Sequence, residues 1–229
     1  VHEISVDIKE GELVGFAGLL GSGRTETAEM IFGANKATQG KITVKGKEVA
    51  IRKPFDAIMN GIAFCPEDRK RDGIIADLSV RENIMLAVQA RRGFMHPLSR
   101  QEQNELADRY IQALSIATPD AEKKIGELSG GNQQKVILAR WMATQPDVLI
   151  LDEPTRGIDV GAKAEIQRLM IEMCEEGVSV FFISSELEEV IRCSNRIIIM
   201  RDGKKAGELE GPFDADTQNR ILQIIAEGA

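Results

Sequence analysis

A glycine-rich segment near the start of the chain has the spacing of a phosphate-binding loop. It consists of Gly18, Leu19, Leu20, Gly21, Ser22, Gly23, Arg24 and Thr25, with Glu26 next. Glycines let such a backbone curl so that its N–H groups point at phosphate oxygens, and the helix that follows adds the positive end of its dipole. Thr25 is placed to offer its hydroxyl to Mg²⁺. Taken alone, the segment also fits a glycine-rich turn without a ligand, because Arg24 stands where such loops usually have lysine.

Two side chains of this loop depart from the usual pattern. Lysine places a compact point charge between the β- and γ-phosphates, whereas the guanidinium of Arg24 is a bulkier planar fork. Glu26 puts a carboxylate where a hydroxyl would favour the phosphates. Both changes predict a weakened nucleotide site.

Two adjacent acids follow an apolar strand pattern. Residues 148–151 are Val-Leu-Ile-Leu, and Asp152 and Glu153 come directly after them. The first carboxylate would bind Mg²⁺, directly or through water, and the second would polarise an attacking water as general base. The alternative is a pair of solvated acids at a strand end, which the phosphate loop upstream makes the weaker interpretation.

A second glycine segment opens another predicted helix. It consists of Leu128, Ser129, Gly130, Gly131, Asn132 and Gln133, and an amphipathic pattern follows it. The hydroxyl of Ser129 and the N–H groups of Gly130 and Gly131 would lie at the helix start, which makes a second anion-binding surface on the same chain. An ordinary Gly-Gly helix start is the alternative.

The order of these segments, and the Leu-Ser-Gly-Gly sequence above all, resembles the ATP-binding cassette (ABC) family. The resemblance implies that residues 128–133 are the signature, which in the family faces the γ-phosphate of ATP held by an opposite domain. Two composite sites would then form in a domain pair, each joining one phosphate loop to the other domain's signature.

Further family landmarks follow from the resemblance. Gly157, Ile158 and Asp159 resemble the D-loop, which communicates across the domain pair. Glu67 stands where the family usually has the Q-loop glutamine, and Ser185 where it usually has the switch histidine. The resemblance adds Glu67 to Thr25 and Asp152 as candidate metal-site residues.

Longer stretches narrow the resemblance to one class. The chain resembles the C-terminal cassette of the tandem ATP-binding subunit of bacterial sugar importers of the ribose, galactose and xylose type. Five stretches together carry this resemblance: GLLGSGRTE, PEDRKRDG, LSGGNQQKV, DEPTRGIDVGAK and ISSELEEV. The class implies ATP and Mg²⁺ as ligands, an N-terminal cassette of the same chain and transmembrane permease subunits as partners, and a periplasmic sugar-binding protein as an indirect one. It also implies a cassette that is itself soluble and peripheral to the cytoplasmic face of the inner membrane.

The departures predict an asymmetric pair. The chain keeps a full signature and Glu153, but its own pocket has Arg24, Glu26, Glu67 and Ser185. We expect the signature to complete an active site on the partner domain, and the chain's own site to bind nucleotide poorly. The isolated domain would then be a weak or inactive ATPase.

The surrounding elements alternate strand with helix, which predicts an α/β fold with a P-loop NTPase core sheet. Strands are expected at residues 13–20, 62–65, 148–151, 178–183 and 196–200, and a small antiparallel hairpin at 41–50. Helices are expected at 25–32, around 166–173 and around Ile221, Leu222 and Ile225. Residues 80–117 form a helical, more charged stretch.

The whole chain is expected to be one nucleotide-binding domain, residues 1–229, with a core at 1–77 and 146–229 and an inserted helical subdomain at about 78–145. The chain starts at Val1 directly in a strand pattern, which suggests a fragment of a longer polypeptide.

Composition limits the alternatives. The net charge of −7 disfavours nucleic-acid binding, which depends on neutralising phosphates. Three scattered cysteines fit a reducing compartment and buried positions. Three other interpretations remain: a soluble ABC ATPase outside transport, a non-catalytic regulatory cassette, and another P-loop NTPase such as a kinase. The first usually carries coiled-coil or basic insertions, which this sequence lacks, and the signature argues against the last.

Overall fold

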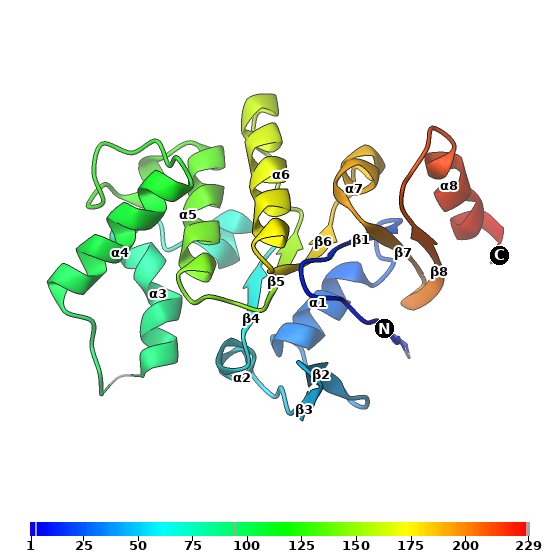
Figure 1. Ribbon diagram of the computed structural model, residues 1–229, viewed down its shortest axis with the longest axis horizontal. Coiled ribbons are helices and arrows are strands. Elements are labelled where there is room, and N and C mark those ends of the chain that lie inside the picture. The colour runs from blue at the N-terminus through cyan, green and yellow to red at the C-terminus, as the bar shows by residue number, and fades with distance from the viewer. Residues whose placement is uncertain (3, 94, 228–229) are drawn as a thin grey trace. The chain divides into compact units, whose positions relative to one another are not determined.

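The structure is a computed structural model that describes residues 1–2, 4–93 and 95–227. It divides into two compact units (Figure 1). The first unit comprises residues 1–64, 147–153 and 170–229, and the second comprises residues 65–146 and 154–169.

A six-stranded sheet forms the centre of the first unit, in the order β4-β5-β6-β1-β7-β8. Strands β5, β6, β1 and β7 run parallel, and β8 runs antiparallel to β7. The strands are β1 (Leu13–Gly18), β4 (Ile62–Cys65), β5 (Val148–Asp152), β6 (Ser179–Ile183), β7 (Arg196–Arg201) and β8 (Lys204–Glu210). The expected α/β fold is thus confirmed.

Continuous apolar runs form the central strands because parallel strands are covered on both faces. Figure 1 shows helix α1 (Arg24–Phe32) on one side of the sheet and α7 (Leu187–Cys193) on the other. Helix α1 packs against β1 and β5, whereas α8 (Thr217–Glu227) packs against β7 and β8. In the core, the rings of Phe16 and Phe181 stack with their centroids 3.7 Å apart.

Two hairpins complete the first unit. Strands β2 (Ile42–Val44) and β3 (Lys47–Val49) form the expected antiparallel hairpin, and a short helix, α2 (Pro54–Met59), follows. Lys45 and Gly46 both have positive φ, at 50° and 74°, as do Asp202 and Gly203 between β7 and β8, at 47° and 72°. Two such residues in succession match the twist of a tight hairpin.

Three helices form the second unit: α3 (Val80–Arg92), α4 (Arg100–Ala113) and α5 (Gly130–Met142). Helix α3 packs against both α4 and α5. Two short turns, η1 (Arg69–Gly73) and η2 (Ile125–Glu127), lie outside these helices, and the long helix α6 (Val160–Glu175) begins in this unit.

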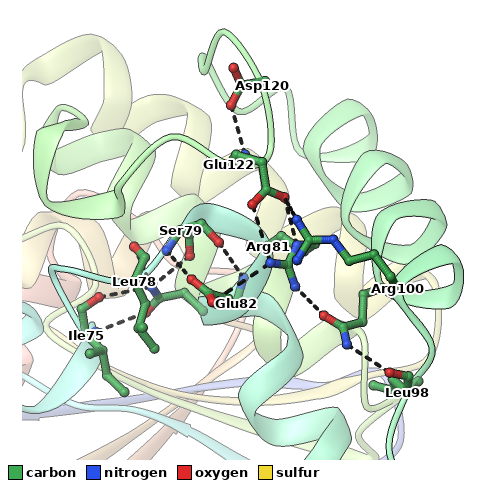
Figure 2. A network of polar contacts seen from close by, with 11 residues as sticks. Ile75, Leu78, Ser79, Arg81, Glu82, Leu98, Arg100, Asp120 and Glu122 are labelled. Carbon is green, nitrogen blue, oxygen red and sulfur yellow. Dashed lines mark hydrogen bonds and ion pairs between the residues drawn. The ribbon is translucent and has the colours of Figure 1, made fainter.

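A polar network fixes the start of α3 to the segment that leads into α5 (Figure 2). Ser79 and Glu82 form a reciprocal capping box, and Ser79 also makes a β-bridge to Lys124. The buried guanidinium of Arg81 donates to Glu122 at 2.8 Å. Arg100 reaches the same carboxylate at 2.8 Å. The loop before the signature is therefore held by charge-assisted bonds.

The structure differs from the expected elements at several places. The strand expected at 13–20 is too long, because it ends at Gly18 and the side chains of Leu19 and Leu20 are 61% and 98% exposed. The helical stretch is interrupted at Gly93 and restarts after Ser99, which caps α4. Helices α2 and α7 and strand β8 were not expected from the sequence.

Other expectations concern burial and boundaries. Cys65 and Cys193 are buried as expected, whereas Cys174 is only half-buried, and all three are free thiols. Within the described residues, no helix has both the length and the apolar character that a bilayer crossing needs. The boundaries of the inserted helical subdomain, about 78–145, stay a prediction.

One buried cation, Arg196, lies at the N-terminal ends of the paired strands β1 and β7. The side chain of Arg196 is 6% exposed and donates to Glu12 at 2.8 Å and to Glu208 at 2.5 Å. Hydrogen bonds from Arg196 and Lys205 lower the pKa of Glu208. Burial alone would raise the pKa of Glu12, but hydrogen bonds from Arg196 and Lys9 outweigh it and lower that pKa.

Replacing Arg196 with methionine should lower the free energy of unfolding at neutral pH by about 3 kcal/mol, because two part-buried carboxylates lose their partner. Both pKa values are lowered by folding, so the carboxylates stabilise the wild type above their ordinary pKa of 4.5 and stop doing so as the pH falls through the lowered values. We therefore expect the variant to lose less stability than the wild type on acidification, measured by urea unfolding between neutral pH and pH ~3.

The matched control is Lys41→Met, which removes an exposed ion pair with Glu48. It should change stability by less than about 1 kcal/mol. Parallel pH profiles for wild type and Arg196→Met would contradict the assignment of acid sensitivity to this cluster.

Candidate functional site

The predicted phosphate loop forms a tight turn between β1 and α1. Gly21 and Gly23 have φ values of 75° and 95°, which residues with a Cβ rarely adopt. The N–H of Ser22 donates to the carbonyl of Leu19 at 3.0 Å, which closes the turn. Gly23 is the N-cap of α1, so the loop ends on the N-terminus of a helix.

The β7–β8 hairpin supports this loop from the same unit. The N–H of Gly203 donates to the carbonyl of Ser22 at 3.0 Å. A Cβ on Gly23 would lie 2.9 Å from the Cα of Gly203, and one on Gly18 would lie 2.5 Å from the carbonyl oxygen of Met200. Backbone therefore meets backbone, and only glycine fits at these positions. Nothing in the sequence pattern indicated this contact with Gly203.

The side chains of the loop lie in different surroundings. Arg24 is only 7% exposed, and its guanidinium donates to the carbonyl oxygen of Ser184 at 2.8 Å. Ser22 is buried, and its hydroxyl finds no hydrogen-bond partner among the described residues. Thr25 is half-buried and Glu26 is exposed in the first turn of α1. An unpaired buried hydroxyl in a loop of this kind is consistent with a ligand oxygen as its partner.

The two predicted acids lie at the carboxyl end of β5. Asp152 is 1% exposed, whereas Glu153 is half-buried. Glu153 has a φ of 48°, an uncommon conformation for a residue with a side chain, and its N–H donates to Ile183 at 3.0 Å. The hydroxyl of Ser185 donates to the Glu153 carboxylate at 3.1 Å. The residue at the switch position thus orients the candidate general base.

A magnesium ion fits part of the predicted metal set. Thr25 and Asp152 supply hydroxyl and carboxylate oxygens, the ligands that Mg²⁺ prefers, and their elements α1 and β5 pack together. In the part of the chain that the structure describes, no three His, Cys, Asp or Glu side chains gather as a metal site. Mg²⁺ commonly uses one or two carboxylates together with substrate phosphates. Glu67 lies in the second unit, and its role at a metal stays a prediction.

The signature segment begins helix α5 in the second unit. Ser129 is exposed and is the N-cap, and its hydroxyl accepts from the backbone and side-chain nitrogens of Asn132 at 3.4 and 2.9 Å. A Cβ on Gly131 would lie 2.6 Å from the Cβ of Ala162 in α6. The amide of Gln133 donates to the carbonyls of Leu128 and Ile125 at 3.2 and 3.3 Å. The first turn of α5 is thus fixed by its neighbours, and the N-cap Ser129 is exposed.

The segment that resembles the D-loop lies beside this turn. Gly157 has a φ of 69°, Ile158 is half-buried, and Asp159 accepts from the N–H of Ala162 at 2.9 Å at the start of α6. Arg156, just before it, forms an ion pair with Glu67.

The structure thus groups the predicted residues in two sets. Within the first unit, the phosphate loop, Asp152, Glu153 and Ser185 lie together at the carboxyl ends of β1, β5 and β6. Within the second unit, Glu67, the signature and residues 157–159 lie together. Sequence reasoning missed Arg69 and Arg156, which join this second set. Arg69 lies in the charged run from 67 to 73, which has the composition of an ordinary solvated loop, and no pattern indicated the contacts of Arg156.

Comparison with known proteins indicates one family. The family described as "ABC transporter" matches residues 1–156. The chain is 59% identical to the galactofuranose transporter ATP-binding protein of Escherichia coli O157:H7 over 99% of its length and 45% of that protein. It is 48% identical to a fructose import ATP-binding protein of Bifidobacterium longum, over 99% of its length and 44% of that protein. The chain thus spans less than half the length of these relatives.

Solved structures confirm the fold. A dimeric ATP-binding cassette in a post-hydrolysis state, bound to ADP and Pi, superposes with a TM-score of 0.78. It is 25% identical, and the match covers 90% of this chain and 88% of that one.

Gly131→Ala should lower the free energy of unfolding by about 1–3 kcal/mol, because the new methyl group overlaps Ala162 on a neighbouring helix. Gly161→Ala is the matched control, since its Cβ would meet only the carboxylate of Asp159, at 3.3 Å. The control should change stability by less than about 1 kcal/mol. Equal effects of the two substitutions in thermal unfolding would contradict the close contact between Gly131 and Ala162.

Proposed function

Because the chain belongs to the ABC transporter family, we propose that it is an ATP-binding and hydrolysing cassette that energises a membrane sugar importer. The observation that carries the proposal is the pair of glycine-bounded helix starts, at Gly23 and at Ser129, on one chain. Each offers backbone N–H groups and a helix N-terminus to an anion. The names of the relatives, which describe galactofuranose transport and fructose import, support sugar as the cargo.

The chemistry of the chain's own site follows from the first unit. Backbone amides of residues 18–25 would bind the β- and γ-phosphates of ATP. Glu153 would accept a proton from water as the water oxygen attacks the γ-phosphorus and the bond to the β-phosphate oxygen breaks. Mg²⁺, held by Thr25 and Asp152, would neutralise phosphate charge.

This site is degenerate in our proposal. The Arg24 guanidinium is committed to the carbonyl of Ser184, on the segment that carries Ser185. A buried arginine held in this way is poorly placed to move onto a γ-phosphate, and Glu26 adds negative charge at the helix start. Ser185 is shorter than histidine and donates to Glu153 instead. These features favour slow turnover at the chain's own pocket.

The signature is intact and takes the opposite role. Ser129 is exposed at the start of α5, where its hydroxyl and the following amides would face a triphosphate held by another cassette. Because the relatives are more than twice as long as this chain, we propose that the other cassette is an N-terminal half of the same polypeptide. Residues 157–159 would contact that half across the domain pair.

The remaining partners follow from the same proposal. The cassette would act at the cytoplasmic face of the inner membrane, bound to permease subunits, with a periplasmic sugar-binding protein delivering the cargo. ATP would close the cassette pair because its phosphates bridge both halves, and hydrolysis would let the pair open. The helices at about 78–145 would form a subdomain that passes this motion to the permease.

Asymmetry predicts unequal effects of two substitutions in the full-length protein. Ser129→Arg should lower kcat for ATP by about a hundredfold or more, because it blocks the electrostatic contacts to the partner's γ-phosphate. Glu153→Gln should lower kcat less than about threefold, because the site it serves contributes little turnover. Steady-state phosphate release measures both.

Asn104→Arg is the control for Ser129→Arg, since it adds the same side chain at an exposed position of α4. It should leave turnover unchanged. A large loss with Glu153→Gln together with a small loss with Ser129→Arg would reverse the assignment of the two sites. Full-length protein without ATP turnover would favour a regulatory cassette.

A further inference from the structure

Arg69 occupies a central position in the second unit. It begins the η1 turn, whose N-cap Asp68 accepts from the N–H groups of Lys70 and Arg71 at 3.1 and 3.0 Å. The Nε of Arg69 donates to the side-chain oxygen of Gln133 at 3.3 Å. Its Nη1 donates to the backbone carbonyl of Arg156, also at 3.3 Å. One planar guanidinium therefore links three segments that are far apart in sequence.

Gln133 links Arg69 to the residues just before the signature serine. While its oxygen accepts from Arg69, its amide nitrogen donates to the carbonyls of Leu128 and Ile125. Leu128 directly precedes Ser129, so the orientation of the Gln133 amide fixes the approach to the helix N-cap. A side-chain amide whose oxygen and nitrogen are both hydrogen-bonded is held in one orientation.

The first signature glycine makes room for the guanidinium. A Cβ on Gly130 would lie 2.9 Å from Nη2 of Arg69 and 3.3 Å from the carbonyl of Gly157. The arginine thus lies directly against the backbone whose amides would face the partner's nucleotide. Glycine at this position serves the approach of Arg69 as well as the approach of a phosphate.

The charge of Arg69 is partly desolvated. Burial lowers the pKa of its guanidinium, and the nearby Asp68 carboxylate acts in the opposite direction. The Gln133 side-chain oxygen and the Arg156 carbonyl oxygen are neutral acceptors, and their hydrogen bonds with the Arg69 cation are charge-assisted. Arg156, whose carbonyl accepts one of these bonds, pairs through its own side chain with Glu67. A continuous polar chain therefore runs from Glu67 to the signature.

We propose that Arg69 is a positioning residue that holds the signature in the geometry for the partner's ATP, through Gln133 and through the backbone before the D-loop. This rests on the proposed function of the signature. Displacement of Glu67, by permease or by nucleotide, would move Arg156 and with it the carbonyl that anchors Arg69. The Ser129 hydroxyl and the amides that follow it would then move away from the position that faces the partner's nucleotide, although the sequence of the signature is unchanged.

The experiment measures ATP turnover by full-length protein carrying Arg69→Ala, Gln133→Ala or both. Arg69→Ala should raise the KM for ATP about tenfold with kcat little changed, because it loosens a contact that binds substrate and transition state alike. The double variant should resemble Arg69→Ala, since both residues belong to one chain of contacts. Arg69→Lys keeps the charge without the fork and should raise KM by less.

Arg71→Ala is the matched control, because Arg71 lies in the same turn and donates to its neighbour Asp72. It should leave KM unchanged. A role in folding alone would lower the melting temperature and the active fraction, and hence kcat, without moving KM. If Arg69→Ala reduces the yield of folded protein, Arg69→Lys carries the test.

The outcomes separate the two claims. Normal wild-type turnover with the same KM in the Arg69 and Arg71 variants would overturn the role of Arg69 and leave the proposed function in place. Additive effects of Arg69→Ala and Gln133→Ala would also overturn it. Wild-type protein without turnover would overturn the proposed function together with this inference.

Discussion

Close contacts that leave no room for a Cβ are the constraint on which both glycine segments depend, with backbone at the phosphate loop and with a side-chain methyl group at the signature. At the phosphate loop, Gly23 lies against Gly203, and Gly18 lies against the carbonyl of Met200. At the signature, Gly131 lies against Ala162. A Cβ at any of these positions would meet another atom at under 3.0 Å. Such packing fixes where the N–H groups at each helix start point, and a fixed set of amide dipoles binds an anion without reorganising.

Side-chain hydrogen bonds near each helix start determine which side chains there are available to contact a phosphate. In the first unit, the buried Arg24 donates to the backbone carbonyl of Ser184, and Ser185 donates to the Glu153 carboxylate. The side chains that would act on a γ-phosphate therefore already have partners within the chain. In the second unit, the guanidinium of Arg69 supports the signature and leaves Ser129 exposed. Under the proposed function, these bonds would weaken the chain's own site and preserve the surface that it offers to a partner.

The sequence allowed the central strands to be predicted better than the short elements around them. Apolar runs such as 148–151 predicted the parallel strands, because strands covered on both faces need no polar residues. Helices α2 and α7 were missed since they are short and show little periodicity, and Leu19 and Leu20 were wrongly added to a strand because exposed apolar residues in a functional loop break the usual pattern. The contacts of Arg69 depend on tertiary geometry, and no local spacing in a charged run carries that information.

The most direct test of the central claim is to trap nucleotide in the full-length protein with vanadate and a photoreactive ATP analogue, and to identify by mass spectrometry which half carries the label. If this chain supplies a signature to a partner and only a weak pocket of its own, the label should lie almost entirely on the other half, and Ser129→Arg should abolish it. Equal labelling of both halves, or trapping that survives Ser129→Arg, would contradict the account.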